Sequence, residues 1–316
     1  MKAIALGLLA SFFFAFTFIL NRAMDLEGGS WIWSAALRYF FMIPLLLVIV
    51  GVRGKLTSLF LTMKKQPFQW FIWSFIGFVL FYAPLCFAAS FGPGWLIAST
   101  WQVTIIAGIL LTPLFYKRVN GERVRERMPL KGFSMSLIIF AGVMFMQVEH
   151  ASALGIKEAL GCIVPVMIAA FAYPLGNRKM MEVCKGRIGP FERVLGMTIM
   201  TLPVWLLLSA YEWSVSGAPS SSQVLQCFFV AISSGVIATV LFFAATDLAK
   251  GDVRKLAAIE ATQSGEIIFA VGGEMLMLSA PLPSSVSCIG MVLVMLGMIL
   301  HSFASHKRQK TKLKAS

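Results

Sequence analysis

Three acidic side chains interrupt one long apolar stretch of the sequence, residues 256–278. They are Glu260, Glu266 and Glu274. If the stretch is a helix with a rise of about 1.5 Å per residue, Glu266 lies near its middle, with Glu260 about 9 Å toward one end and Glu274 about 12 Å toward the other. Apolar surroundings favour the protonated form of a carboxyl group, so its proton can be exchanged when the surroundings change. We therefore predict that Glu266 is a proton-coupling residue; the alternative is a neutral or ion-paired Glu266 that only stabilises the fold.

The two outer glutamates are further candidates for the same role. At 100° per residue, Glu274 lies about 40° around the helix from Glu260, and Gln263 lies near the same face. Because both glutamates are close to an end of the stretch, where water is near, a structural or solvated role is the alternative for each. Gln263 could hydrogen-bond a bound molecule or bridge neighbouring helices.

A basic residue, Arg38, lies about seven residues inside a second apolar stretch, residues 31–50. At that depth its side chain cannot easily extend to the outer surface, so it needs a partner inside the protein. An ion pair with a buried acid, such as Glu266, is one expectation. Binding of an anionic group of a substrate is the other.

Uncharged polar and aromatic residues add to the candidate site. Asn21 ends the first apolar stretch, and Gln102 follows Trp101 in the fourth. The two amides could bind a substrate or bridge helices. The indole of Trp101 could hold a flat or cationic compound, or lie in the core or against lipid.

The composition indicates that membrane-spanning helices position these residues. Of the 316 residues, 58% are hydrophobic and 13% are charged, whereas about 25% are charged in soluble proteins. Apolar stretches of the length needed to cross a bilayer are residues 3–21, 31–50, 70–90, 95–116, 132–148, 159–177, 193–211, 224–247, 256–278 and 284–304. They are much longer than the strands of an outer-membrane barrel, and in lipid the backbone must pair within each segment. We predict an all-α integral membrane protein with ten transmembrane helices.

Basic residues are unevenly divided among the loops. Of the 27 Lys and Arg residues, 18 fall in the second, fourth, sixth and eighth loops. Cytoplasmic loops retain positive charge, so this pattern predicts that both termini are cytoplasmic, in a multi-pass protein of the plasma (inner) membrane. The net charge of +13 then reflects topology, and we expect no nucleic-acid partner. For the basic tail, residues 306–316, binding to lipid headgroups or nucleic acid is the alternative interpretation.

Similar segments recur about half a chain apart. FTFILNRAM, residues 16–24, resembles AYPLGNRKM, residues 172–180, at an offset of 156, and Gly77 and Gly235 occupy similar places in the third and eighth stretches. Together with the odd number of stretches per half, these matches predict two inverted five-helix repeats, which are typical of transporters. The halves are residues 1–150 and 151–305, followed by the tail, 306–316; chance similarity of apolar segments is the alternative.

The chain resembles the EamA-type drug/metabolite transporter superfamily over nearly its whole length. The resemblance depends on residues 14–24, on Arg38 and on residues 258–278, and is strongest to the EmrE-like multidrug-resistance efflux branch. It implies secondary transport without ATP hydrolysis, through a path between helices one to four and six to nine, with helices five and ten peripheral. The sequence departs from the small multidrug-resistance proteins because residues 3–21 and 159–177 contain no acid. Specificity for quaternary ammonium compounds therefore does not follow from the resemblance.

These observations favour secondary transport, with efflux of a small organic metabolite or drug coupled to protons. A lipid or lipid-precursor flippase and a non-transporting membrane scaffold are the alternatives. We expect no enzymatic activity, metal or cofactor, because the three histidines and five cysteines form no recognisable catalytic or metal-binding motif. The expected partners are a small-molecule substrate and the lipid bilayer. Gly290 and Gly297 lie on one face of the last stretch and predict close helix contact, within the chain or between two copies in a homodimer.

Overall fold

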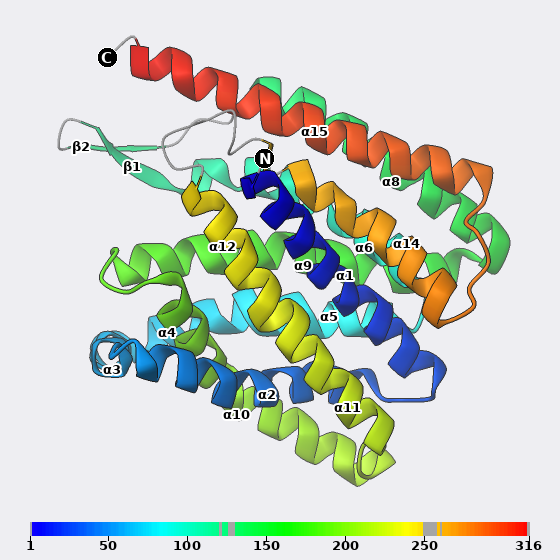
Figure 1. Ribbon diagram of the computed structural model, residues 1–316, viewed down its shortest axis with the longest axis horizontal. Coiled ribbons are helices and arrows are strands. Elements are labelled where there is room, and N and C mark those ends of the chain that lie inside the picture. The colour runs from blue at the N-terminus through cyan, green and yellow to red at the C-terminus, as the bar shows by residue number, and fades with distance from the viewer. Residues whose placement is uncertain (1, 120–121, 126–129, 249–257, 260, 315–316) are drawn as a thin grey trace.

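Long apolar helices make up the computed structural model of the chain, which describes residues 2–119, 122–125, 130–248, 258–259 and 261–314 (Figure 1). Eight helical runs among these residues are long and apolar enough to cross a membrane. They are Lys2–Leu26, Trp31–Val52, Pro67–Ala88, Phe133–Ala153, Ile156–Cys184, Pro190–Ser216, Ser221–Phe242 and Ser285–Phe303. A shorter apolar run covers Gly94–Leu110. The protein is therefore a helical, multi-pass membrane protein, and the predicted total of ten crossings stays a prediction.

Four of the spans are single helices that extend beyond the predicted stretch at one or both ends. They are α1 (Lys2–Leu26), α2 (Trp31–Val52), α9 (Ile156–Cys184) and α10 (Pro190–Ser216). A hydropathy window detects only the part of a helix that crosses hydrocarbon, whereas the backbone bonds continue into the interface. The helix α10 ends where Gly217 adopts a positive φ of 79°, a conformation that favours glycine.

The third and eighth spans each contain a π-helical segment. The third consists of α4 (Pro67–Ser74), η1 (Phe75–Val79) and α5 (Leu80–Ala88), and the eighth consists of α11 (Ser221–Val230), η3 (Ala231–Ile237) and α12 (Ala238–Leu248). The segments η1 and η3 are π-helical. They contain Gly77 and Gly235, the two glycines matched in the sequence. Segments of this kind are rare in proteins and are frequent at functional sites.

The fourth and ninth spans are also interrupted. In the fourth, α6 (Gly94–Trp101) is separated by a turn at residues 102–103 from α7 (Thr104–Leu110), and the 3₁₀ segment η2 (Thr112–Leu114) follows. In the ninth, the 3₁₀ segment η4 (Thr262–Ser264) precedes α14 (Gly265–Met277). The interruptions therefore fall at or next to Gln102 and Gln263.

Two elements outside the spans were absent from the prediction. An antiparallel hairpin joins β1 (Tyr116–Val119) to β2 (Glu122–Arg125), with Tyr116 paired to Arg125. The two residues between its strands are Asn-Gly in the sequence, a strong hairpin signal that a hydropathy scan does not detect. A short helix, α3 (Leu56–Lys65), lies in the second loop. The all-α architecture is confirmed for the spans, and the hairpin is an addition in the fourth loop.

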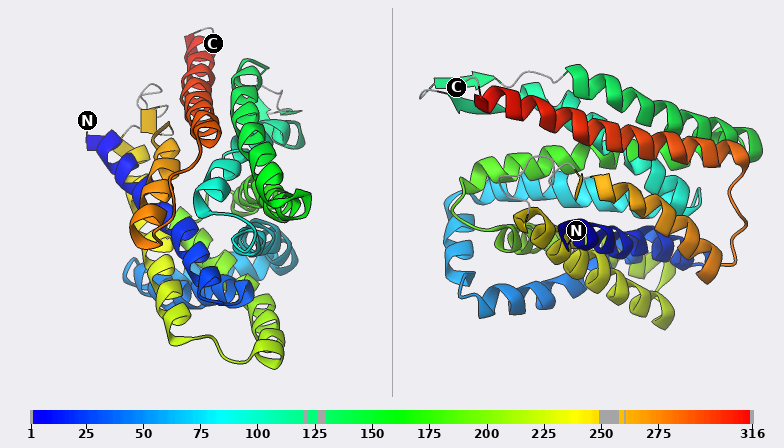
Figure 2. Two further views of the ribbon diagram at one scale, coloured as in Figure 1. Left: turned by 90° about the vertical axis from the view of Figure 1, so that its right-hand side faces the viewer. Right: turned by 45° about the horizontal axis from the view of Figure 1, so that its top comes forward.

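The helices α8 (Leu130–Leu154) and α15 (Ser285–Lys314) pack side by side along one edge of the bundle (Figures 1 and 2). A Cβ atom at Gly142 would lie 2.5 Å from the Gly290 carbonyl oxygen, and one at Gly297 would lie 2.7 Å from Ile139. The predicted contact at Gly290 and Gly297 is therefore made within the chain. The helix α15 continues to Lys314, so much of the predicted tail extends the last helix.

Several of the main helix contacts in one half of the chain have an equivalent in the other half. The first span, α1, packs against the eighth and ninth, and its counterpart α9 packs against the third and fourth. The counterparts α2 and α10 pack against each other, as do α8 and α15. The bundle encloses a hydrophobic core between these pairs, which includes Trp70, Tyr82 and Trp205.

The connections divide between the two ends of the bundle. The helix α3, the β1–β2 hairpin and the C-terminal end of α15 lie at one end, on the left of Figure 1. The α1–α2, α10–α11 and α14–α15 connections lie at the other end. We call the first the basic end, because the loops there contain most of the Lys and Arg residues of the sequence.

Candidate functional site

Arg38 lies inside the bundle against an aromatic ring. Its side chain is buried, and its Cζ atom is 4.1 Å from the centre of the Tyr82 ring on α5. The Tyr82 hydroxyl donates a hydrogen bond of 3.3 Å to Oδ1 of Asn21 on α1. Two of the predicted site residues, Arg38 and Asn21, are thus brought together by a tyrosine that the sequence analysis did not single out.

No described carboxylate forms an ion pair with Arg38, so the expected pairing with Glu266 was wrong. The ion pairs recorded among the described residues are Arg22 with Asp25 and Lys179 with Glu182. The Nε atom of Arg38 is buried without a hydrogen-bond partner in the described part of the chain. The physical reason is the packing: the guanidinium lies over the face of an aromatic ring, a favourable position for a cation.

Aromatic rings extend from Arg38 through the centre of the bundle. Tyr39 stacks on Trp205 of α10 with ring centres 4.9 Å apart, and Phe81 contacts Trp101 at 5.1 Å and Tyr173 of α9 at 4.7 Å. We call the following residues the aromatic cluster: Tyr39, Phe81, Tyr82, Trp101, Tyr173 and Trp205. Only Trp101 was a predicted site residue. The others lie on several spans, so no spacing within one stretch could reveal their association.

Tyr173 is partly exposed, although its neighbours on the same face of α9 are buried. Val166, Ala169 and Met180 lie four or seven residues away on the same helical face and are fully buried. Tyr173 is nevertheless 39% exposed, although its ring packs within the aromatic cluster. Tyr173 is therefore packed in the aromatic cluster and partly exposed at the same time.

Glu266 lies where the two interrupted spans meet. It lies in the first turn of α14, two residues after the end of η4, and is buried. Its hydrogen-bond partner is the side chain of Gln102, at the turn in the fourth span. Tyr173 is within electrostatic range of both Glu266 and Arg38. Nε2 of Gln263 is buried without a partner among the described residues, whereas Glu260 lies outside them. The structure thus brings Glu266 and Gln102 together next to the aromatic cluster.

Glu274 has a different environment, because it caps another helix. Its carboxylate accepts hydrogen bonds from the backbone N–H groups of Gly94, at 2.6 Å, and Trp95, at 3.4 Å. These residues form the N-terminus of α6, where unpaired N–H groups favour an anion. A Cβ atom at Gly94 would lie 2.6 Å from the Phe18 carbonyl oxygen, so glycine permits this close approach. The exposed fraction of Glu274 is 1%, and a solvated role for this residue was therefore wrong.

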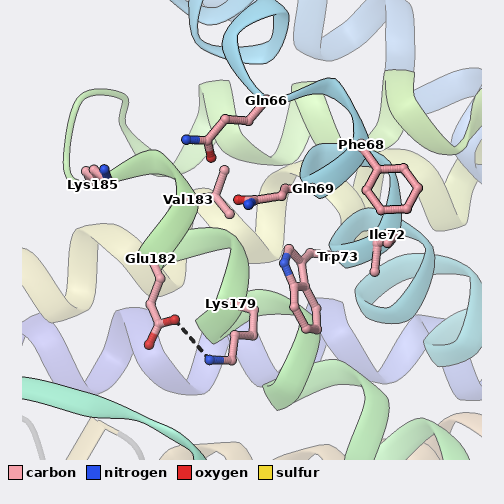
Figure 3. A pocket seen from close by; sticks show the side chains of 9 residues that line it. All are labelled: Gln66, Phe68, Gln69, Ile72, Trp73, Lys179, Glu182, Val183 and Lys185. Atoms are coloured by element: carbon pink, nitrogen blue, oxygen red, sulfur yellow. Dashed lines mark hydrogen bonds and ion pairs between the residues drawn. The ribbon is translucent and has the colours of Figure 1, made fainter.

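A pocket of about 520 Å³ opens at the basic end between α4 and α9. Figure 3 shows the Lys179 and Glu182 side chains, joined by an ion pair of 3.0 Å, opposite Gln69 and Trp73. Further along, the same two spans carry Tyr82 and Tyr173 of the aromatic cluster. This pocket was not predicted, because its residues come from two spans far apart in the sequence, whose association depends on the fold.

Interrupted spans and buried ionisable groups between helices are features typical of membrane transporters. Comparison with known proteins agrees with this class. A family profile described as "EmrE: Putative multidrug resistance efflux transporter" matches residues 1–307. The chain belongs to this family of efflux transporters, as the resemblance predicted.

Two relatives and one solved structure extend the comparison. The chain is 55% identical to the uncharacterized protein YjlA of Bacillus subtilis (strain 168), over 99% of this chain and 98% of YjlA. It is 54% identical to an uncharacterized 42.1 kDa protein of Shouchella clausii, over 84% of this chain and 70% of that protein. A protein of known crystal structure has the same fold, with a TM-score of 0.60 and 15% identity, over 94% of this chain and 95% of the other.

Proposed function

We propose that this protein exports a small organic molecule across the plasma membrane in a proton-coupled cycle, with Glu266 carrying the coupling proton. The substrate binds next to the aromatic cluster, between Arg38 and Glu266. The membership of an efflux family supports the class of activity. The coupling ion and the substrate site are the parts that the proposal adds.

The observation that carries the proposal is the position of Glu266. It joins the interrupted ninth span to the interrupted fourth span through Gln102. Discontinuous helices are the elements from which transporters build their substrate and ion sites. Protonation of Glu266 changes both the charge and the hydrogen bonding at this junction. A change there can therefore alter how the two spans pack.

An inverted repeat of ten helices, with halves 1–150 and 151–305, accounts for the packing pattern. Several main helix contacts have a counterpart under exchange of the halves: those of α1 with α12 and α14 correspond to those of α9 with α5 and α7. The π segments η1 and η3 occupy corresponding spans and contain Gly77 and Gly235. Alternating access then follows when the two halves exchange conformations around the central site.

The basic end is cytoplasmic in this proposal, and so are both termini. The loops at that end retain most of the positive charges, as cytoplasmic loops do. The pocket bordered by Trp73 and Lys179 then opens toward the cytoplasm. It lies between the two spans that lead to Tyr82 and Tyr173, and it is the access route that we assign to an exported substrate.

Proteoliposomes containing the purified protein and an internal pH-sensitive dye test this function. The substrate is a compound that raises the melting temperature of the purified protein in a ligand screen. Adding it to one side should move protons in a direction that reverses with the substrate gradient. A scaffold would give no substrate-dependent proton movement. A flippase would move a fluorescent lipid between leaflets without requiring the soluble compound. Liposomes without protein provide the background rate.

A further inference from the structure

Arg38 is a buried cation whose charge no described acid compensates. Its side chain is 9% exposed, and its electrostatic neighbours include Tyr39, Tyr82 and Cys86. The guanidinium lies over the face of the Tyr82 ring, and the Tyr82 side chain is its hydrogen-bond partner as well as that of Asn21. A buried charge is costly unless it is paired and hydrogen-bonded. The contact with one ring leaves the hydrogen-bonding capacity of the guanidinium incompletely used.

A second unpaired donor belongs to the aromatic cluster that Arg38 contacts through Tyr82. The Nε1 atom of Trp205 and the Nε atom of Arg38 are both buried without a hydrogen-bond partner among the described residues. The Trp205 ring stacks on Tyr39, the residue next to Arg38. Each of the two atoms can donate a hydrogen bond and neither can accept one. This part of the bundle therefore has two buried donors that an acceptor on a bound molecule can satisfy.

A planar apolar surface continues from these donors. Phe81, Trp101 and Tyr173 contact one another, and Tyr173 is 39% exposed. Aromatic faces of this kind bind flat apolar groups. The site thus combines a positive, donor-rich part at Arg38 with an aromatic part at Trp101.

We propose that the substrate is an aromatic organic anion whose carboxylate binds the Arg38 guanidinium while its ring lies on the aromatic cluster. This inference rests on the proposed transport function and specifies its substrate class. A carboxylate supplies the missing negative charge and accepts hydrogen bonds in a geometry that matches a guanidinium. A purely cationic drug would instead place a second positive charge beside Arg38.

Matched probes separate the charge of the ligand from its shape. Each set has one aromatic body with a carboxylate, an amide or an amine as its end group. The first set is 3-phenylpropionate, 3-phenylpropionamide and 3-phenylpropylamine. The second set is indole-3-acetate, indole-3-acetamide and tryptamine. We expect the carboxylate of each set to bind the purified wild-type protein at least tenfold more tightly than its amide, measured by thermal shift and by quenching of tryptophan fluorescence. Equal or tighter binding by the amides or amines, or no binding by any probe, overturns the proposal.

Variants assign the preference to Arg38. Arg38→Gln should remove the carboxylate preference, and Arg38→Lys should retain part of it. The control is Arg53→Gln, because the Arg53 guanidinium also lies over a ring, that of Phe191 at 4.9 Å, but outside the site; it should leave the preference unchanged. A carboxylate preference that survives Arg38→Gln overturns the assignment. If that variant does not fold, Arg38→Lys decides. A weakened or lost carboxylate preference supports the assignment, and a preference equal to that of the wild type overturns it.

A stability measurement distinguishes a substrate-binding arginine from a structural one. Because Arg38 has no described carboxylate partner, Arg38→Met should melt at the same temperature as the ligand-free wild type or higher, and the carboxylate probes should no longer stabilise it. A melting temperature well below that of the wild type would show that Arg38 has a structural partner. Proton movement driven by an amine or a neutral compound, together with no carboxylate preference, would refute this inference while leaving the transport function intact.

Discussion

Glu266 and Glu274 lie eight residues apart on α14 and are both buried, yet we expect opposite effects when each is replaced by glutamine. Glu274 accepts hydrogen bonds from two backbone N–H groups of α6, whereas the partner of Glu266 is the side chain of Gln102. A hydrogen bond to a charged group contributes about 1.5–3 kcal/mol, and one between neutral groups about 0.5–1.5 kcal/mol. The interaction of a carboxylate with a helix N-terminus contributes up to about 2 kcal/mol.

Glu274→Gln removes the charge and keeps one acceptor oxygen. The short bond to Gly94 then becomes a neutral one, and the amide NH₂ group cannot accept from Trp95. Together with the lost interaction with the helix N-terminus, these changes should cost about 2–4 kcal/mol of stability. Glu266→Gln keeps a hydrogen-bonding group toward Gln102 and removes a carboxyl group that is costly to ionise, so its stability should stay within about 1 kcal/mol of the wild type.

Thermal unfolding of both purified variants in detergent, monitored by circular dichroism, measures the difference. We expect the melting temperature of Glu274→Gln to fall by several degrees and that of Glu266→Gln to be unchanged or higher. Equal melting temperatures for Glu274→Gln and the wild type would show that the carboxylate does not cap α6. A large loss of stability in Glu266→Gln would assign it a structural role instead of proton coupling.

Two further predictions concern packing and orientation. A methyl group at Gly176 would collide with the backbone of Gly77, whereas one at Gly77 first meets the flexible end of Met197. Gly176→Ala should therefore destabilise the protein by about 1–3 kcal/mol, more than Gly77→Ala does. Equal melting temperatures of the two variants would contradict this account of the contact between η1 and α9. A cysteine introduced at Ser220, in the α10–α11 connection, should react with a membrane-impermeant maleimide only from outside the cell, and labelling confined to the cytoplasmic side would overturn the proposed orientation.

Hydropathy was sufficient to locate most of the membrane-spanning helices. The stretches 3–21 and 31–50 correspond to α1 and α2, because about 20 apolar residues in lipid can satisfy their backbone only as a helix. It was not sufficient to locate the interruptions at η1 and η3. These depend on local backbone geometry around glycines and on contacts with neighbouring spans, which hydropathy does not register. The β1–β2 hairpin was missed because its signal is the turn sequence and not its apolar content.

The candidate site was predicted only in part, for a related reason. Glu266 was identifiable because a carboxyl group in an apolar stretch is unusual by its residue type alone. The role of Glu274 depends on Gly94, 180 residues earlier in the chain, so no pattern within one stretch could indicate it. Tyr82 and Trp205 resemble ordinary core residues in the sequence. Only the fold places their rings beside Arg38 and Tyr39.

The central claim is that Glu266 carries the coupling proton, and transport by Glu266→Gln in proteoliposomes tests it most directly. Glutamine matches the protonated side chain in size and hydrogen bonding but cannot release a proton. Exchange of labelled substrate between two equal pools requires only binding and alternation, whereas accumulation driven by a pH gradient also requires deprotonation. We predict that Glu266→Gln retains exchange and loses pH-driven accumulation. Accumulation at the wild-type level by this variant would contradict the claim.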